Sequence, residues 1–279
     1  MALTVNSPNN ISKSRVIAVI PARFASTRLP GKALVDIAGK PMVCRVADVA
    51  STVVNVDRVI VATDNRQIFD AVSSYGIEVV MTSIDHSSGT DRVAEAISNL
   101  PEASIVVNLQ GDEPLISPKT IERAVNTLIS EDDPGAGIVT TWEPMESAED
   151  VMNPDVVKIA VDGNDIALYF SRSPIPYPRD AVRRNGTLED ALRNEPDLID
   201  SFRKHTGLYV YRREVLMKFT GWPQSKLEKA EALEQLRALE HGIKIKAIVA
   251  SSKSTGVDTP EDLARVREML ESEQRERLV

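Results

Sequence analysis

"RVIAVIPARFASTRLPGK", residues 15–32, joins an apolar run to a loop that carries three cations. The apolar run, 15–20, is typical of a strand that is buried on both faces of a parallel sheet. Similar runs rich in Val and Ile recur along the first half of the chain, at 58–63, 77–82 and 104–110. We therefore expect these strands to form the core of one sheet.

Segments with helical character separate the apolar runs. In 91–100, for example, apolar residues recur at the spacing of one helix face. This alternation predicts an α/β fold with a doubly wound, mostly parallel sheet. Ligands of such sheets bind at the carboxyl ends of the strands. Further helices are expected at 42–54, 66–75 and 118–130.

The second half of the chain has a different pattern. Two strand-like runs, 156–162 and 166–171, are separated by "GND", which predicts a hairpin. The following segment, 173–200, is rich in prolines and charges, and we expect one helical turn in it, near 188–192. We interpret 150–220 as a smaller, β-rich subdomain that is embedded in the main fold.

The last third of the chain returns to regular elements. A strand is expected at 206–212, and 225–240 has the pattern of one helix that ends at Gly242. A strand at 243–250 and a helix from Pro260 close the chain. No linker separates these elements from the first half, which indicates a single domain.

Composition narrows the functional classes. The 279 residues include 41 acidic and 33 basic side chains, a net charge of −8, which argues against general nucleic-acid binding. The apolar runs are far shorter than the roughly 20 residues of a membrane-spanning helix. Cys44 is the only cysteine, and residues 1–14 read as a loose polar tail without the features of a secretory signal. We expect a cytoplasmic protein with one domain at 15–279.

The loop after the first strand has the composition of an anion site. Arg23, Arg28 and Lys32 lie close together, and the prolines and Gly31 restrict the backbone that carries them. Three converging cations suit a triphosphate. The loop is not a Walker A motif, because Ala33 follows the Gly-Lys pair and the earlier glycine is absent. A solvated basic turn is the alternative.

Two acidic stretches are candidates for a metal site. In "NLQGDEPLI", 108–116, Asp112 follows a buried strand, where a carboxylate can hold Mg²⁺ beside phosphate oxygens. In "STGVDTPEDL", 254–263, Thr259 suits the start of a helix and leaves Asp258 available for a metal. The alternative for Asp112 is an ordinary turn that caps the next helix.

A third polar stretch, "SSGTDR" at 87–92, contains small residues that permit close approach of a ligand. Thr90 and Asp91 are better explained as helix N-caps. Arg92 lies one turn into the expected helix, where a cation opposes the helix dipole, and this mild cost favours a role in ligand binding.

The expected helix at 225–240 carries a leucine stripe on one face. Glu231 and Glu234 lie on the opposite face, with Gln235 beside them. Periodicity leaves open whether these side chains face water, the usual arrangement, or a ligand rich in hydroxyl groups. Among the three histidines, only His205 has aromatic neighbours in the sequence.

These motifs occur together in one known family. "PARFASTRLPGK", "VATD", "SSGTDR", "QGDEP", "YFSR", "HTGLYVYR", "LEQLR" and "GVDTPEDL" follow the order of the 3-deoxy-manno-octulosonate (Kdo) cytidylyltransferases, which the chain resembles over 15–269. The resemblance implies a fold like that of nucleotide-diphospho-sugar transferases. It also implies a reaction in which CTP and Kdo give CMP-Kdo and diphosphate with Mg²⁺, for lipopolysaccharide biosynthesis. It further implies a homodimer, which we expect to form through 150–220.

The resemblance assigns roles at the nucleotide end. It places Arg23, Arg28 and Lys32 on the phosphates and makes Asp112 and Asp258 the metal ligands. Arg28 and Lys32 would be catalytic with the two aspartates, because charge builds on the leaving diphosphate. The residues that match the cytidine side are Ala22, Arg92 and Gln110.

At the sugar end the chain departs from the family pattern. Val210 stands where a small residue is expected between two tyrosines, and the excursion 173–204 is long. Strand alternation predicts that His205 and Tyr209 share one face and that Val210 lies on the other. The residues that match the sugar-acid pocket are Arg172, His205, Tyr209, Glu234 and Gln235.

Three other functions remain open from the sequence. A cytidylyltransferase for 8-amino-Kdo or a sialic acid would use the same nucleotide site. A regulatory protein would bind CTP without releasing diphosphate. A glycosyltransferase of similar fold would consume a sugar nucleotide instead of making one.

Overall fold

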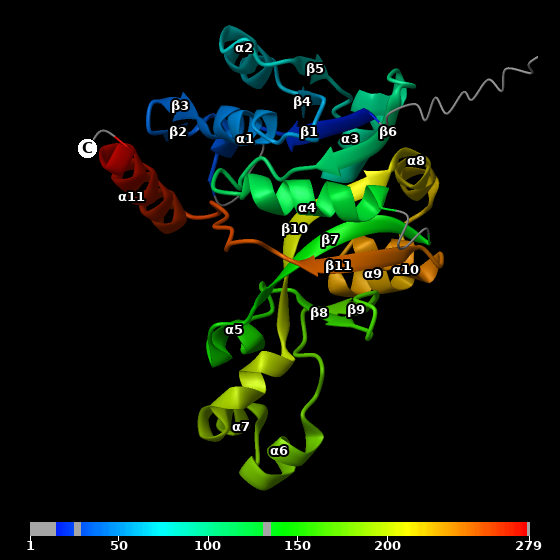
Figure 1. The fold of residues 1–279 in the computed structure, drawn as a ribbon, viewed down its shortest axis with the longest axis vertical. Coiled ribbons are helices and arrows are strands. Elements are labelled where there is room, and N and C mark those ends of the chain that lie inside the picture. Colours follow the sequence, from blue (N-terminus) through cyan, green and yellow to red (C-terminus); the bar gives the residue numbers. More distant parts are fainter. Residues whose placement is uncertain (1–14, 25–28, 131–134, 278–279) are drawn as a thin grey trace, which may run out of the picture.

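The computed structural model describes residues 15–24, 29–130 and 135–277. The expected tail, 1–14, lies outside these residues, as does Arg28. Within the described residues, seven strands form the backbone of the main sheet in the order β11-β7-β10-β6-β1-β4-β5 (Figure 1). The bounds are β1 Arg15–Ala22, β4 Arg58–Thr63, β5 Val79–Met81, β6 Ala103–Asn108, β7 Ala136–Pro144, β10 Arg203–Arg212 and β11 Lys244–Val249.

The sheet is mostly parallel, as the sequence predicts. Strand β1 pairs in parallel with β4 and β6, β4 with β5, and β7 with β11. Strand β10 is the exception, because it runs antiparallel between β6 and β7. The carboxyl ends of β1, β4 and β6 therefore meet at one edge, where ligands of such sheets bind.

Strand β1 shows why the sheet is buried on both faces. Val16 and Ile20 pack into one hydrophobic cluster, whereas Ile17 and Val19 pack into another. Side chains of α1, α2 and α4 complete the first cluster, and those of α3, α8 and α10 (Gln235–Glu240) complete the second. The doubly wound architecture is thus confirmed. The bounds are α1 Met42–Ser51, α2 Arg66–Ser74, α3 Gly89–Ser98, α4 Pro118–Ile129 and α8 Arg213–Gly221.

Residues 150–220 include a hairpin and a helical arm that extends away from the main sheet (Figure 1). Strands β8 (Lys158–Val161) and β9 (Ala167–Ser171) pair with each other, and β8 also pairs with β10. The expectation of one helical turn in the excursion is wrong. The arm has its own small core of Met145, Val151, Leu192 and Phe202, which stabilises more helix than the local sequence indicates. Its elements are α5 Ala148–Met152, α6 Arg179–Asn185, α7 Leu188–Asn194 and the 3₁₀ helix η2 Pro196–Ser201.

The single helix expected at 225–240 is also wrong. The segment forms α9 (Lys226–Glu231) and α10 (Gln235–Glu240), which are separated at Ala232, where φ is 51°. The break has a tertiary cause. The Glu231 carboxylate accepts hydrogen bonds from Ser171 Oγ at 2.7 Å and from the Arg172 amide at 2.9 Å, so it faces β9 and not water.

The C-terminal helix α11 (Pro260–Arg277) begins as predicted, because Thr259 Oγ1 accepts a hydrogen bond from the Asp262 amide. Val257 and Leu263 pack against Ile37 and Met42 of the first half of the chain. This contact brings the loop before α11 to the carboxyl edge of the sheet. No helix of the described residues is long and apolar enough to cross a bilayer. The remaining short elements are η1 Lys32–Leu34, β2 Asp36–Ile37 and β3 Lys40–Pro41.

Candidate active site

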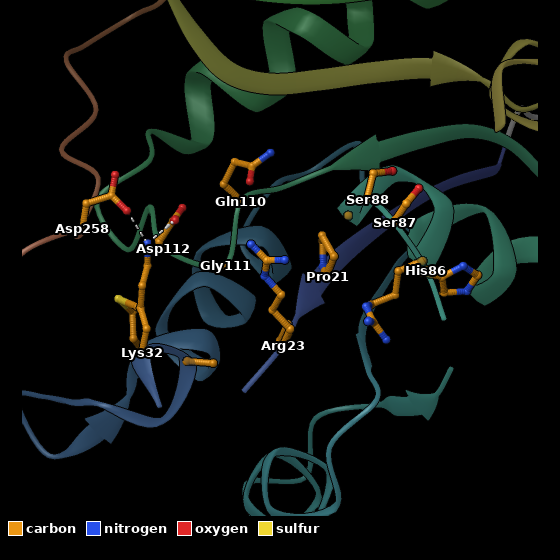
Figure 2. A pocket seen from close by; sticks show the side chains of 15 residues that line it. Pro21, Arg23, Lys32, His86, Ser87, Ser88, Gln110, Gly111, Asp112 and Asp258 are labelled. Carbon is orange, nitrogen blue, oxygen red and sulfur yellow. Dashed lines mark hydrogen bonds and ion pairs between the residues drawn. The ribbon is translucent and has the colours of Figure 1, made fainter. Parts of the chain in front are cut away.

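A cleft of about 510 Å³ opens at the carboxyl edge of β1 and β6 (Figure 2). Lys32 points toward Asp112 and Asp258 at one end, and His86, Ser87 and Ser88 lie at the other. The described residues that line the cleft are Pro21, Ala22, Arg23, Lys32, Ala33, Met42, His86, Ser87, Ser88, Gly89, Arg92, Gln110, Gly111, Asp112 and Asp258.

Two glycines shape the loops around this cleft. Gly31 has φ of 68°, a left-handed conformation that starts the short helix carrying Lys32. At Gly111, a Cβ atom would lie 3.2 Å from the carbonyl oxygen of Pro21. The loop after β6 therefore packs directly on the carboxyl end of β1, from which the basic segment leaves.

Lys32 joins the two predicted metal ligands. Its Nζ lies 2.5 Å from Asp112 Oδ2 and 2.6 Å from Asp258 Oδ1. Burial by itself would lower the Lys32 pKa, but the two carboxylates outweigh burial and raise it. The Val257 amide also donates to the carbonyl oxygen of Asp112, at 2.9 Å, so main-chain contact supports the juxtaposition.

The donor set at this point fits a hard divalent cation. Asp112 and Asp258 already share one cation, the Lys32 ammonium group, so their oxygens can converge on a single centre. No group of three or more His, Cys, Asp or Glu side chains forms such a site in the described ranges. Two carboxylates with water and phosphate oxygens are typical of Mg²⁺ sites.

The predicted cytidine residues all line the cleft, but they differ in their contacts. Ala22 is buried at the end of β1, and Arg23 follows it. Gln110 Nε2 donates to the carbonyl oxygen of Gly207 at 3.3 Å, which links the cleft to β10. Arg28 cannot be placed, because it lies outside the described residues.

Arg92 is held deeply by its neighbours. It is 4% exposed, its Nη2 lies 2.6 Å from Asp64 Oδ2, and its Nη1 bonds Thr82 Oγ1. The predicted N-cap of its helix was misplaced, since Ser88 is the cap and Asp91 completes the capping box three residues later. Arg92 thus presents a fixed cation to the cleft.

The predicted sugar residues of β10 lie as strand alternation requires. The His205 ring lies 5.4 Å from that of Tyr209 and 5.0 Å from that of Phe170, measured between centroids. Val210 packs in the cluster on the opposite face of the sheet from Tyr209. The predicted face assignment is confirmed.

Arg172 is anchored by main-chain carbonyl groups. Its Nε donates to the carbonyl oxygen of Glu231 at 2.7 Å, and its Nη1 donates to that of Pro154 at 2.9 Å. The side chain therefore joins β9, α9 and the loop after α5. It does not line the cleft described above.

Glu234 and Gln235 stand at the start of α10, and neither lies on a solvated face. Thr90 Oγ1 donates to Glu234 Oε1, and Asn108 Nδ2 donates to Thr90 Oγ1 at 3.3 Å. Burial raises the Glu234 pKa, and the hydrogen bond from Thr90 opposes that rise. Gln235 is 6% exposed.

Several polar residues at the site were not singled out from the sequence. Asp64 directly follows strand β4. A polar residue at the end of a buried strand is a feature of the sequence that indicates a place in the site. Glu113, next to Asp112, is a second such residue. Its Oε2 accepts from Ser254 Oγ at 3.1 Å, and the Ser254 amide donates to Glu143, which fixes the segment leading to Asp258. Burial, with the Asp112 carboxylate, raises the Glu113 pKa to about 7.

Comparison with known proteins agrees with this geometry. Residues 17–245 match the model of a family described as Cytidylyltransferase. A 3-deoxy-manno-octulosonate cytidylyltransferase of Trichlorobacter lovleyi is 45% identical over 92% of this chain and 98% of its own length. The enzyme of that name from Geobacter sulfurreducens is 48% identical over 91% of this chain and 99% of its own.

Comparison with solved structures agrees with the family match. CMP:2-keto-3-deoxy-manno-octonic acid synthetase complexed with CTP superposes with a TM-score of 0.82 and 41% identity, over 93% of this chain and all of the other. A 4-diphosphocytidyl-2C-methyl-D-erythritol synthase of Anaerococcus prevotii has a TM-score of 0.58, with 94% and 98% covered. At 16% identity, this second structure shows likeness of fold alone.

Proposed function

We propose, because the chain belongs to the cytidylyltransferase family, that it transfers the cytidylyl group of CTP to Kdo and releases diphosphate. The relatives at 45% and 48% identity carry the name of this enzyme, and the synthetase with 41% identity was solved with CTP. The observation that carries the proposal is the meeting of Lys32, Asp112 and Asp258 at one end of a cleft. The product, CMP-Kdo, would then supply lipopolysaccharide biosynthesis.

The nucleotide would lie along this cleft. We assign the base and ribose to the end formed by Ala22, Arg92 and Gln110, where Arg92 is fixed by Asp64. The phosphates would lie toward Arg23 and Lys32, and Arg28 belongs to the same loop. The position of Lys32 beside two carboxylates supports this direction, because the triphosphate must meet both the cations and the metal ligands.

Asp112 and Asp258 would hold Mg²⁺. The convergence of both carboxylates on one ammonium group supports this assignment. Charge on the phosphate oxygens would be neutralised there by the bound cation. With Asp112 and Asp258 on the cation, Lys32 would be free of its ion pairs and would donate to the leaving diphosphate.

The reaction is a displacement at phosphorus. The anomeric hydroxyl oxygen of Kdo forms a bond to the α-phosphorus, the bond to diphosphate breaks, and the hydroxyl proton passes to solvent. Such chemistry depends on positioning and on neutralising charge in the transition state. Arg28 and Lys32 serve the leaving group, and the cleft walls hold the α-phosphate in line.

The acid sugar would bind on the β10 side of the cleft. We assign His205, Tyr209, Glu234 and Gln235 to its hydroxyl groups. The family resemblance assigns Arg172 to its carboxylate, and because Arg172 lies outside the cleft with its guanidinium group on main-chain carbonyl groups, this role requires the side chain to move. The link from Gln110 to Gly207 supports this placement, since it joins the cleft to the strand that carries His205 and Tyr209. Glu234 is joined to α3, which borders the cleft, by its hydrogen bond from Thr90.

Release of diphosphate tests the function. The protein is incubated with CTP, Mg²⁺ and one acid at a time, either Kdo, 8-amino-Kdo or a sialic acid. We expect Kdo to give the highest kcat/KM. A higher value with another acid would reassign the substrate, and CTP binding without diphosphate from any acid would indicate a regulatory protein.

We also propose a cytoplasmic homodimer. Strand β9 pairs only with β8 among the described strands, and Leu168 on it is 61% exposed. Tyr177, just beyond, is 63% exposed. These apolar side chains in 150–220 support an interface there. Light scattering would measure the oligomeric state, and cell fractionation would test the location.

A further inference from the structure

Thr140 is a fully buried residue of β7 whose side chain contacts three residues of β10, namely His205, Leu208 and Tyr209. Its Oγ1 lies 2.8 Å from the carbonyl oxygen of Leu208 and 2.9 Å from Nε2 of His205. We propose that Thr140 is a positioning residue that fixes the proton of His205 on Nε2, so that Nδ1 accepts a hydrogen bond from a hydroxyl group of the acid sugar. The choice of ligand rests on the proposed function.

The direction of each hydrogen bond follows from the donors present. A threonine hydroxyl has one hydrogen and two lone pairs, whereas a carbonyl oxygen only accepts. The Thr140 hydrogen therefore goes to Leu208. Oγ1 must then accept from His205, and a neutral imidazole donates from Nε2 only when Nε2 carries its proton. Nδ1 is left with a free lone pair.

The surroundings of His205 keep the ring neutral. Burial lowers its pKa to about 3, so the imidazole does not gain a second proton near neutral pH. The edge-on contact with Phe170 and the tilted contact with Tyr209 hold the plane of the ring. With one proton and a fixed plane, the ring presents a single defined acceptor.

His205 lies next to the cleft and not in its lining. His205 is half-buried, and no hydrogen bond joins its Nδ1 to any residue that the structure describes. The same strand meets the cleft two residues later, where the carbonyl oxygen of Gly207 accepts from Gln110. An acceptor at this position recognises a hydroxyl donor and gains nothing from an analogue that lacks the hydroxyl.

The tautomer can be measured without substrate. Long-range ¹H–¹⁵N spectra distinguish a protonated ring nitrogen from one with a lone pair. We expect His205 to carry its proton on Nε2 in the wild-type protein and in Thr140→Ser, and to become a mixture of tautomers in Thr140→Val. A wild-type proton on Nδ1, or an unchanged tautomer in Thr140→Val, overturns the proposal.

Kinetics test the role of Nδ1. Thr140→Val should raise the KM for Kdo by about twofold, the factor expected when about half of the His205 rings carry the proton on the wrong nitrogen, with the KM for CTP unchanged. Thr140→Ser should restore it. The matched control is Thr141→Val, because Thr141 is equally buried but its hydroxyl bonds Thr206. Equal losses in the two valine variants would mean that Thr140 acts only through stability.

Titration with Kdo separates this inference from the proposed function. Added Kdo should shift the Nδ1 resonance of wild-type His205. If wild-type protein turns over CTP with Kdo but Nδ1 does not shift, the positioning role is wrong while the function stands. If no diphosphate is released with Kdo, the proposed function is wrong, and the tautomer spectra still decide whether Thr140 sets the proton.

Discussion

Asp112 and Asp258 meet at the ammonium group of Lys32, although one follows β6 and the other precedes α11. Val257 bonds to the main chain of Asp112, so the two segments remain together without depending on Lys32 alone. Three charges in such proximity make turnover sensitive to substitutions that hardly affect folding.

Asp258→Asn should abolish most turnover. The change keeps the size of the side chain but removes a ligand charge, and we expect kcat to fall by about 100-fold or more. The Asp258 side chain is 45% exposed, so the loss of its ion pair should cost less than about 1 kcal/mol of stability. Diphosphate release and thermal melting measure the two effects. Near-normal turnover would show that the metal is held elsewhere.

Lys32→Met should strengthen metal binding but slow the turnover of CTP. Without the ammonium group, the two carboxylates lose a competing cation, so Mn²⁺ should bind the CTP-free protein about tenfold more tightly. The kcat with CTP should fall, because the leaving diphosphate loses a donor. Electron paramagnetic resonance of Mn²⁺ measures the first effect. Unchanged Mn²⁺ affinity, or a raised KM for CTP with intact kcat, would contradict these roles.

Stability should decline in acid partly through His205. Burial lowers its pKa from the ordinary value of 6.5 to about 3, so between these values the unfolded chain binds a proton that the folded protein does not. The stabilisation is present above pH 6.5 and is lost as the pH falls. His205→Asn should flatten the dependence by up to about 1.4 kcal/mol per pH unit. Denaturant unfolding at pH 4 to 7 compares the slopes, and identical slopes would refute the buried neutral state.

Val210→Gly should affect stability more than specificity. Val210 is fully buried on the face opposite Tyr209, and its loss leaves a cavity and a weakened strand, which we expect to cost about 3 kcal/mol. Val249→Gly, at a 37% exposed position of β11, is the control and should cost much less. Relative kcat/KM for Kdo and a sialic acid should stay constant. A switch in the preferred acid would place Val210 in the pocket.

The sequence by itself determined the class of fold and the loops of the nucleotide site. Apolar runs such as 15–20 and 104–110 are buried on both faces of a sheet, and local pattern is sufficient to locate them. Because parallel strands end at the same edge, Lys32 and Asp112 could be predicted as neighbours before their distance was known.

On the sugar side, strand alternation gave the faces of β10, and tertiary structure decided the hydrogen bonds. At the break at Ala232, Glu231 bonds to Ser171 of β9 and to the amide of Arg172 just after it, a long-range contact that helical periodicity does not reveal. The proton of His205 likewise depends on Thr140, a residue of a neighbouring strand. Local sequence determines the spacing of apolar side chains. Hydrogen bonds between distant segments form only when the chain has folded. These hydrogen bonds determine where each polar group points.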